Sequence, residues 1–398
     1  MSNRISTASF HGDTINRMLA RQADLSKTQE QLASGTRIQS PADDPVAATR
    51  ILDLDRQKAQ LTQFGTNSDV LTARLSMTEQ AFSDANGVLN RIREITLQAS
   101  GPAIDSSARK TLVAELDTRK QELLDIANRT DANGEYLFSG TSTGTRPFAA
   151  SAGSNAYFGD QGVRLVQIGS DQKIADGFTG QQVFRSIAGG NGTFQVAQGT
   201  HAGDSSIDSG VVVDPAAWVP GSYQLQFTSS SNWQVVDSAN SVVASGAYVS
   251  GSVIAFNGAQ LTVSGNPAAS DTYTITPATD QDVFSSIDRL RNDLSAASDS
   301  PVGRAALATT LTQSLVQFDN GLSNLSSVRA ELGTRLSTIE TTQSVRQQAS
   351  DELTGAVGKL RDVDYAAAIS RMNQQMLGLQ AAQSAYSKIA QLSLFNYL

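Results

Sequence analysis

The sequence predicts a multidomain α+β protein: an elongated α-helical bundle or coiled coil built from both the N- and C-terminal segments, with an inserted antiparallel β-domain. Two observations support this prediction. Seven-residue apolar repeats occur on both sides of the middle of the chain. Between them, residues 186–280 contain no Lys or Arg, and their apolar residues alternate with polar ones. Because helices and strands have different side-chain periods, the two patterns indicate different secondary structures.

The C-terminal repeat predicts one long helix over residues 304–345. Its apolar members are Leu311, Leu315, Phe318, Leu322, Leu325, Leu332, Leu336 and Ile339. The N-terminal half supplies a matching row, which consists of Leu61, Phe64, Leu71, Leu75, Phe82, Ala85, Leu89, Ile92 and Ala99. A further helix is expected over residues 105–131. We expect these rows to pack against one another within the chain, since an amphipathic helix usually buries its apolar stripe intramolecularly.

The middle block predicts short antiparallel strands. Alternating pairs and triplets of apolar residues are separated by Gly, Asn, Ser and Pro, and Asn257-Gly258 is a hairpin signal. Its large aromatic residues, Trp218, Tyr223, Trp233 and Tyr248, leave two interpretations open. They form the core of the β-domain, which is the more common use of aromatics at strand spacing, or they line a carbohydrate site.

Two similar segments bracket the middle block. Thr179–Ile187 and Thr279–Ile287 share six of nine residues. We therefore hypothesise that the β-domain was inserted into a smaller protein with duplication of the junction sequence. A variant lacking residues 180–279 that stays soluble and helical would support this history, and an insoluble or molten product would contradict it.

Composition excludes several classes of function. The 398 residues have a formal net charge of -8, so a nucleic-acid partner is not expected. There is no cysteine, which removes disulfides, thiolate nucleophiles and Cys-based metal sites. Residues 1–20 lack the apolar core of a Sec-type signal peptide, and no run is long enough for a transmembrane helix. We expect a protein without membrane insertion.

The chain also lacks the patterns that carry catalysis. His11 and His201 are its two histidines, and no His-Glu-x-x-His or phosphate-binding loop motif occurs. The glycines at 189–192 are best interpreted as a flexible turn. The sequence thus predicts no catalytic residue, no cofactor and no metal.

Two carboxylate pairs occur at two-residue spacing. They are Asp53 with Asp55, and Asp362 with Asp364. On a helix this spacing sends the two side chains to different faces, so we expect a solvated helix surface at both.

Residues 32–45 hold the most specific motif, with the sequence LASGTRIQSPADDP. Asp44 before Pro45 predicts a helix N-cap and first helical residue. The whole segment resembles the N-terminal signature of the bacterial flagellin family. Residues 331–336 (ELGTRL), 373–382 (NQQMLGLQAA) and 393–398 (SLFNYL) resemble its C-terminal region. Within this family, residues 133–141 (NGEYLFSGT) and the ending SLFNYL are more similar to the hook-filament junction proteins than to filament flagellins.

This resemblance implies a domain arrangement and a set of partners. Residues 1–45 and 356–398 are expected to form the helices of an inner layer, residues 46–184 (with a β-hairpin region) and 280–355 a helical middle domain, and residues 185–279 an outer β-rich domain. The expected partners are further copies of the chain in a ring, hook-associated protein 1, flagellin and a flagellar export chaperone. The resemblance also implies passage through the flagellar export apparatus to the cell exterior.

The terminal segments carry the predicted assembly surface. Its residues are Met18, Leu25, Leu32, Tyr365, Ile369, Met372, Met376, Leu379, Tyr386, Ile389, Leu394, Phe395, Tyr397 and Leu398. Since a lone subunit offers little to cover these apolar rows, we expect its ends to be disordered and to order on assembly. The alternative is an intramolecular hairpin of the two ends. Filament flagellin, and an exported surface-binding protein that uses the β-domain, remain alternative functions. A peptidase in the β-domain is disfavoured by the missing zinc-binding His pair.

Overall fold

A computed structural model describes residues 7–101, 104–151 and 154–391. The chain divides into two compact units, which are treated separately below. The terminal unit combines residues 1–66 with residues 341–398, and the central unit holds residues 67–340. Both unit boundaries fall inside long helices.

Helices form most of both units. They are α1 (Thr7–Ser34), α2 (Pro45–Ala99), α3 (Ser106–Ala127), α4 (Val283–Ala296), α5 (Pro301–Arg361) and α6 (Tyr365–Gln391), with a π-helical turn η1 (Gln181–Arg185). The helix predicted over residues 304–345 is therefore longer at both ends. The helix predicted over residues 105–131 is shorter. Asp105 caps its start by accepting a hydrogen bond from the Ala108 amide, and Asn128 caps its end.

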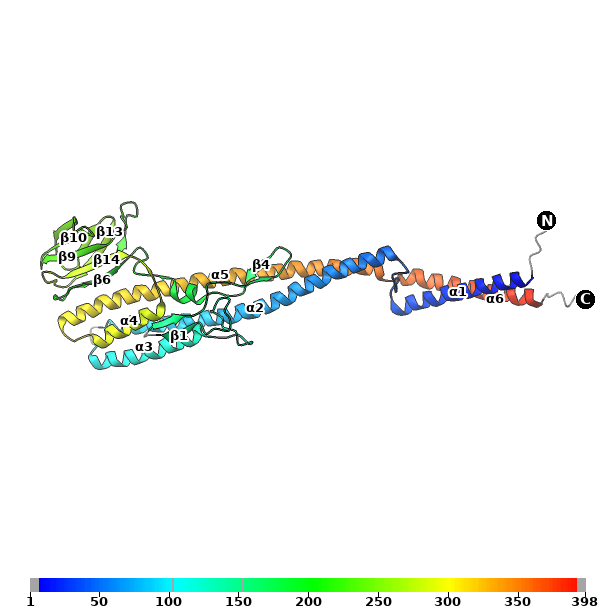
Figure 1. The fold of residues 1–398 in the computed structure, drawn as a ribbon, viewed down its shortest axis with the longest axis horizontal. Coiled ribbons are helices and arrows are strands. Elements are labelled where there is room, and N and C mark those ends of the chain that lie inside the picture. The colour runs from blue at the N-terminus through cyan, green and yellow to red at the C-terminus, as the bar shows by residue number, and fades with distance from the viewer. Residues whose placement is uncertain (1–6, 102–103, 152–153, 392–398) are drawn as a thin grey trace, which may run out of the picture. The chain divides into compact units, whose positions relative to one another are not determined.

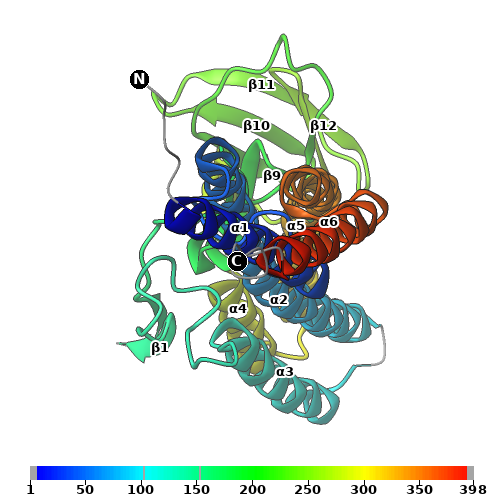
Figure 2. The ribbon, with the colours of Figure 1, turned by 90° about the vertical axis from the view of Figure 1, so that its right-hand side faces the viewer.

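In the terminal unit, α1 and α6 lie side by side (Figures 1 and 2). A small apolar cluster connects the loop after α1 with the start of α2 and the end of α5. It consists of Ile38, Ala47, Ile51 and Val357.

The central unit has a continuous apolar core between α2, α3, α4 and α5. The predicted rows point into it: Phe82 and Ile92 on α2, like Phe318 on α5, have no exposed surface. Leu71 and Leu75 of α2 pack with Ile339 of α5 in a smaller cluster. The prediction of intramolecular packing for these rows is confirmed. Aromatic rings fill the centre through edge-to-face and offset contacts, and these rings belong to Phe82, Phe138, Phe148, Phe178, Phe184 and Phe284.

The strands are short and antiparallel. They are β1 (Phe148–Ser151), β2 (Ser154–Tyr157), β3 (Leu165–Gln167), β4 (Lys173–Ala175), β5 (Ile187–Ala188), β6 (Phe194–Gln198), β7 (Ser206–Ile207), β8 (Val211–Val212), β9 (Tyr223–Ser229), β10 (Asn232–Asp237), β11 (Val242–Ala247), β12 (Val253–Phe256), β13 (Ala259–Ser264), β14 (Thr272–Pro277) and β15 (Asp280–Gln281). A five-stranded sheet has the order β11-β10-β9-β14-β6, and β12-β13-β7 form a second sheet with β8 beside β13. Asn257-Gly258 makes the β12–β13 turn with positive φ at both residues, as a type I′ hairpin requires. The α+β prediction with an inserted antiparallel β-domain is confirmed.

The β-domain has an apolar core separate from that of the helices. Tyr223 and Tyr248 are buried in it, and Trp218 packs on Phe194 with ring centroids 5.2 Å apart. Trp233 lies over Gly246 of the neighbouring strand. These aromatics are packing residues, so the geometry gives no support to a carbohydrate site.

The two ends of the β-domain meet where it joins the helices. β5 pairs with β15, with Ala188 opposite Asp280 and Ile187 opposite Gln281. The bracketing segments also meet, because Phe184 and Phe284, at matching places in them, have ring centroids 5.9 Å apart. An insertion with both ends at one place is compatible with the insertion hypothesis, which stays a prediction until the deletion is made.

Candidate assembly surfaces

The residues 32–45 motif forms the turn between α1 and α2 and is tied to the break between α5 and α6. The Arg37 amide donates to the Arg361 carbonyl over 2.6 Å, and the Val363 amide donates to the Gly35 carbonyl over 3.0 Å. Gly35 has a φ of 71°, and a Cβ atom there would lie 2.9 Å from the Tyr365 hydroxyl. Any other residue at this position would be strained, which gives the glycine of the motif a physical reason.

Two neighbouring aspartates fix this turn. Asp44 accepts a hydrogen bond from the Ala47 amide over 3.0 Å, so the predicted N-cap before Pro45 is confirmed. Asp43 forms a 2.6 Å ion pair with Lys27 of α1 and accepts from the Ser40 amide over 2.9 Å. The Lys27 contact holds the pKa of Asp43 well below its usual value, and the Ala47 amide lowers the pKa of Asp44. Both aspartates therefore stabilise the turn when their side chains are ionised.

The two carboxylate pairs have different roles. Asp53 pairs with Arg56 on the exposed surface of α2, as expected. For the second pair the side chains are exposed as expected, but the expected helix was wrong, because α5 ends at Arg361. Asp362 forms an isolated bridge with Thr36, and Asp364 caps α6 by accepting from the Ala367 amide over 3.1 Å.

The predicted terminal residues fall into two sets. The half-buried set lies in helices α1 and α6 and consists of Met18, Leu25, Leu32, Met372, Leu379 and Tyr386. The exposed set consists of Tyr365, Ile369 and Met376, which are 54%, 46% and 42% exposed. The Ile389 side chain, and Leu394, Phe395, Tyr397 and Leu398, lie outside the described residues. The first set is therefore partly covered within the helix pair, and the second set lies on the exposed surface of the pair.

Three further exposed apolar residues were missed by the sequence analysis. Ile15 and Leu19 on α1 and Leu377 on α6 are 41%, 57% and 64% exposed. They lie outside the seven-residue rows, but Ile15 and Leu19 are four residues apart and so share a helix face. A search for pairs at that spacing would have found them.

The described contact between α1 and α6 buries few side chains completely. Among the side chains described on these two helices, those with less than a tenth of their surface exposed are small or polar: Thr28, Gln31 and Ala368. Gln31 donates its side-chain amide to the Arg37 carbonyl over 2.8 Å. The pair therefore leaves a large part of its apolar surface to solvent in a single copy.

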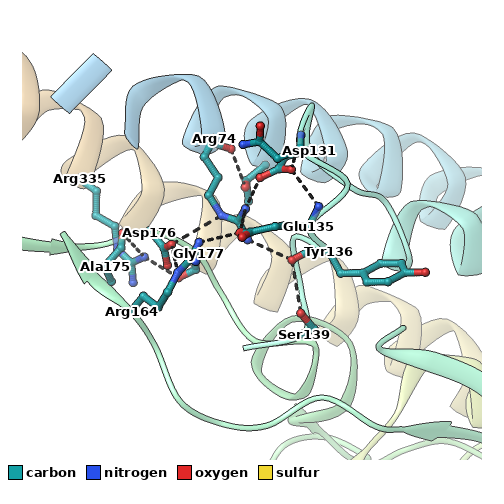
Figure 3. A network of polar contacts seen from close by, with 12 residues as sticks. Arg74, Asp131, Glu135, Tyr136, Ser139, Arg164, Ala175, Asp176, Gly177 and Arg335 are labelled. Carbon is teal, nitrogen blue, oxygen red and sulfur yellow. Dashed lines mark hydrogen bonds and ion pairs between the residues drawn. The ribbon is translucent and has the colours of Figure 1, made fainter. Parts of the chain in front are cut away.

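A second candidate surface lies in the central unit, beside the residues 133–141 motif. A groove of about 780 Å³ runs between α2 and the loops around Asp131 and Leu165. Exposed Val70, Met77 and Leu165 line it. Its floor is a network of polar contacts around Arg74, shown in Figure 3.

Arg74 joins α2 to three acidic side chains from the loops. Its guanidinium, 8% exposed, pairs with Asp131, with Glu135 at 3.3 Å and with Asp176 at 3.8 Å. It also donates to the Tyr136 carbonyl over 3.0 Å. The motif thus has a structural explanation, because Glu135 and Tyr136 hold the loop against α2.

The described residues show two absences. No group of three or more His, Asp and Glu side chains among them has an arrangement that could hold a metal ion. None of the helices in the described part of the chain has the length and apolarity needed to cross a membrane.

Comparisons with known proteins agree with the terminal motifs. Residues 5–143 match the bacterial flagellin N-terminal helical region, and residues 315–398 match the bacterial flagellin C-terminal helical region. Flagellar hook-associated protein 3 of Escherichia coli is 25% identical over 394 residues, which cover 99% of each chain. A phase 1 flagellin of Salmonella naestved is 30% identical over 139 residues, 35% of this chain and 28% of that protein.

Solved structures give the same result. The crystal structure of hook-associated protein 3 from Legionella pneumophila superposes with a TM-score of 0.76 at 32% identity, over 78% of this chain and 98% of that chain. Full-length similarity separates these relatives from the flagellin, whose match is confined to a third of the chain. The chain therefore belongs to the flagellin family, as a homologue of flagellar hook-associated protein 3.

Proposed function

We propose that this chain is a structural subunit of the bacterial flagellum, located at the junction between hook and filament. The observation that carries the proposal is similarity to hook-associated protein 3 over 99% of both chains. The match to filament flagellin covers 35% of the chain. A subunit that polymerises into the filament itself is therefore the less well supported alternative.

The terminal helices are the surface through which copies of the chain assemble. In a pair of helices, each helix buries one stripe of side chains against the other and exposes its remaining faces to solvent. On α6, Ile369, Met376 and Leu377 remain 42% to 64% exposed. Burial of apolar surface yields about 25 cal/mol per Å², so neighbouring copies that cover these side chains gain stability. Since α1 and α6 already pair within one chain, assembly then adds to the stability of residues 1–45 and 356–398.

The same role implies positions for the helical middle regions, the β-domain and the partner proteins. The helical regions 46–184 and 280–355 form the middle layer, and residues 185–279 project outward as the β-rich domain. Hook-associated protein 1 lies on one side of the ring of subunits and flagellin on the other. An export chaperone holds the terminal segments before the chain leaves the cell through the flagellar export apparatus.

Rescue of a mutant tests the junction role. The chain is expressed in a motile bacterium that lacks its own junction protein, and swimming is scored together with flagellin lost to the medium. We expect restored swimming with retained filaments. Continued loss of flagellin, although the chain is exported, would contradict the junction role and favour a minor filament flagellin or a surface-binding protein.

A matched pair of variants tests the terminal surface in the same strain. Ile369→Asp with Leu377→Asp places charges on the exposed apolar face of α6, and we expect export without filament retention. Gln374→Asp with Gln380→Asp places the same two charges at exposed polar positions of α6 and should behave as the unmodified chain. Full rescue by the double variant would show that assembly does not use this face.

A further inference from the structure

The β-domain rests on a polar face of α5. The residues of this face are Thr309, Gln313, Ser314, Gln317 and Asn320, which recur at helical spacing. The Ile207 amide of the β-domain donates to the Thr309 hydroxyl over 3.1 Å, and Asn320 donates its side-chain amide to the Ala188 and Gly190 carbonyls over 2.9 and 2.8 Å. Since the apolar cores of the β-domain and the helices are separate, the contact between them depends on polar groups.

A small cavity of about 50 Å³ lies within this contact. The β-domain contributes Ser209 and Gln195 to its wall, α4 contributes Ser286, and α5 contributes Gln313 and Gln317. The cavity is thus lined mainly by polar side chains from three parts of the chain that are distant in the sequence.

Three of the polar atoms at this cavity have no hydrogen-bond partner in the protein. They are Ser209 Oγ, Gln313 Nε2 and Gln317 Nε2, and all three are buried. Ser209 is 8% exposed and Gln317 is 7% exposed. Buried polar groups in native proteins are nearly always paired with protein or with ordered water. Three of them around one cavity therefore indicate a common partner.

Two polar neighbours in the wall are already paired and do not supply that partner. Gln281 donates its side-chain amide to the Gln195 side-chain oxygen over 2.7 Å, and the Ser286 hydroxyl donates to the Asp282 carbonyl over 3.0 Å. The free hydrogen-bonding capacity is thus concentrated on the β-domain side at Ser209 and on the α5 side at Gln313 and Gln317.

We infer that this cavity is a hydration site, in which ordered water bridges Ser209 of the β-domain to Gln313 and Gln317 of α5. A water molecule occupies about 30 Å³ in the liquid and needs two to four polar partners, so the volume and the wall fit one or two molecules. The two amide nitrogens and Arg289 in the wall disfavour a cation. Because Arg289 is the charged side chain in the wall, a small anion is the competing occupant, and the bromide soak described below separates it from water.

The hydration site has a consequence for the β-domain as a module. A contact made through water and polar side chains can open without exposing either apolar core, because each core is complete within its own part. The short β5–β15 ladder would then be the remaining connection. The β-domain is accordingly a separately cooperative unit that is seated on α5 through water.

Crystallography of the full chain at a resolution that shows ordered water tests the site directly. We expect density within hydrogen-bonding distance of Ser209 Oγ and of both glutamine amides. A crystal soaked in bromide supplies the control, since bromide scatters anomalously and water does not. A dry cavity, side chains that turn to pair with one another, or an anomalous peak at this position would each overturn the inference.

Thermal unfolding of a single variant gives an independent test. Gln317→Met keeps the side-chain length and removes the amide. If water bridges the contact, the variant loses a bridging hydrogen bond, and the unfolding midpoint of the β-domain falls by a few degrees. An unchanged or raised midpoint would overturn the inference, because a dry cavity gains from losing an unpaired amide. Gln343→Met, an exposed position on the same helix, is the control.

Discussion

The terminal helix pair and the central helices carry similar apolar patterns, yet they bury them to different degrees. On α2 and α5 of the central unit, Leu75 and Phe318 have no exposed surface. On α6 of the terminal unit, Ile369 and Met376 are 46% and 42% exposed. The pattern therefore identifies which side of a helix is apolar, while burial depends on what the fold places against that side.

The number of neighbouring elements explains the difference. In the central unit, α3, α4 and the loops around Phe138 and Phe178 close the space around the long helices. In the terminal unit, α1 packs against α6 as a two-helix pair. Two helices alone cannot enclose a core, so the terminal pair is the part of the chain that gains most from contact with another copy.

Truncation of one apolar side chain in each region should give the largest contrast. Phe82→Ala removes a ring that contacts Phe138 and Phe178 at centroid distances of 5.8 and 5.4 Å. We expect a loss of about 3–5 kcal/mol in the free energy of unfolding. Leu377→Ala, at an exposed position, should change it by less than about 0.5 kcal/mol. Urea titrations of both variants measure the two values, and similar losses would contradict the proposed difference in packing.

Loss of an ion pair should show the same contrast between the two units, with a smaller change in the free energy of unfolding. Arg74→Met removes the buried cation among Asp131, Glu135 and Asp176 and leaves buried carboxylates without their partner, which should cost about 3 kcal/mol. Lys27→Met breaks an ion pair whose lysine is 54% exposed, and we expect a much smaller loss, because solvent screens exposed pairs. Denaturant unfolding compares the two. An equal cost would mean that the Arg74 network is solvated despite its burial.

Sequence reasoning predicted the parts of the fold that depend on local pattern. The helical rows, the strands and the Asn257-Gly258 turn each follow from a period or from a residue with special backbone freedom. The extension of α5 to Arg361 was not predicted, because its last turns carry few apolar residues for a repeat to detect. Similarly, Asp362 and Asp364 looked like helix surface because nothing in their spacing marks the break between α5 and α6.

The candidate surfaces were harder to predict from the sequence than the helices and strands. Exposure is a property of three-dimensional neighbours, so the rows could not separate Met372, which is half-buried, from Met376, which is exposed. The Arg74 network joins residues up to 102 positions apart, and no local pattern links them. The same holds for the cavity between Ser209 and Gln317.

Helix caps provide a contrast of intermediate size. Asp282 caps α4 by accepting from the Ser285 amide over 2.8 Å, and α4 is packed in the central core. Asp282→Ala should lower the free energy of unfolding of the central unit by about 1 kcal/mol. Asp364→Ala at the start of α6 should instead increase amide exchange in the first turn of that helix, with little change in global unfolding. Equal effects on global unfolding would mean that α6 belongs to the same cooperative unit.

Acid should loosen the turn of the terminal unit, and this is the smallest effect that we predict. The pKa of Asp43 lies well below the usual 3.8 because Lys27 and the Gln39 and Ser40 amides hold its ionised form. A pKa that is lowered in the folded state contributes stability at pH values above the unfolded pKa and loses it as the pH falls toward the folded value. Protection of the Gln39 and Ser40 amides from exchange should therefore be full at neutral pH and decline below about pH 4. Asp43→Asn removes the titrating group and should give weaker protection that does not change over this range. If the unmodified chain kept its protection as the pH fell, the ionised Asp43 would not be what holds the turn.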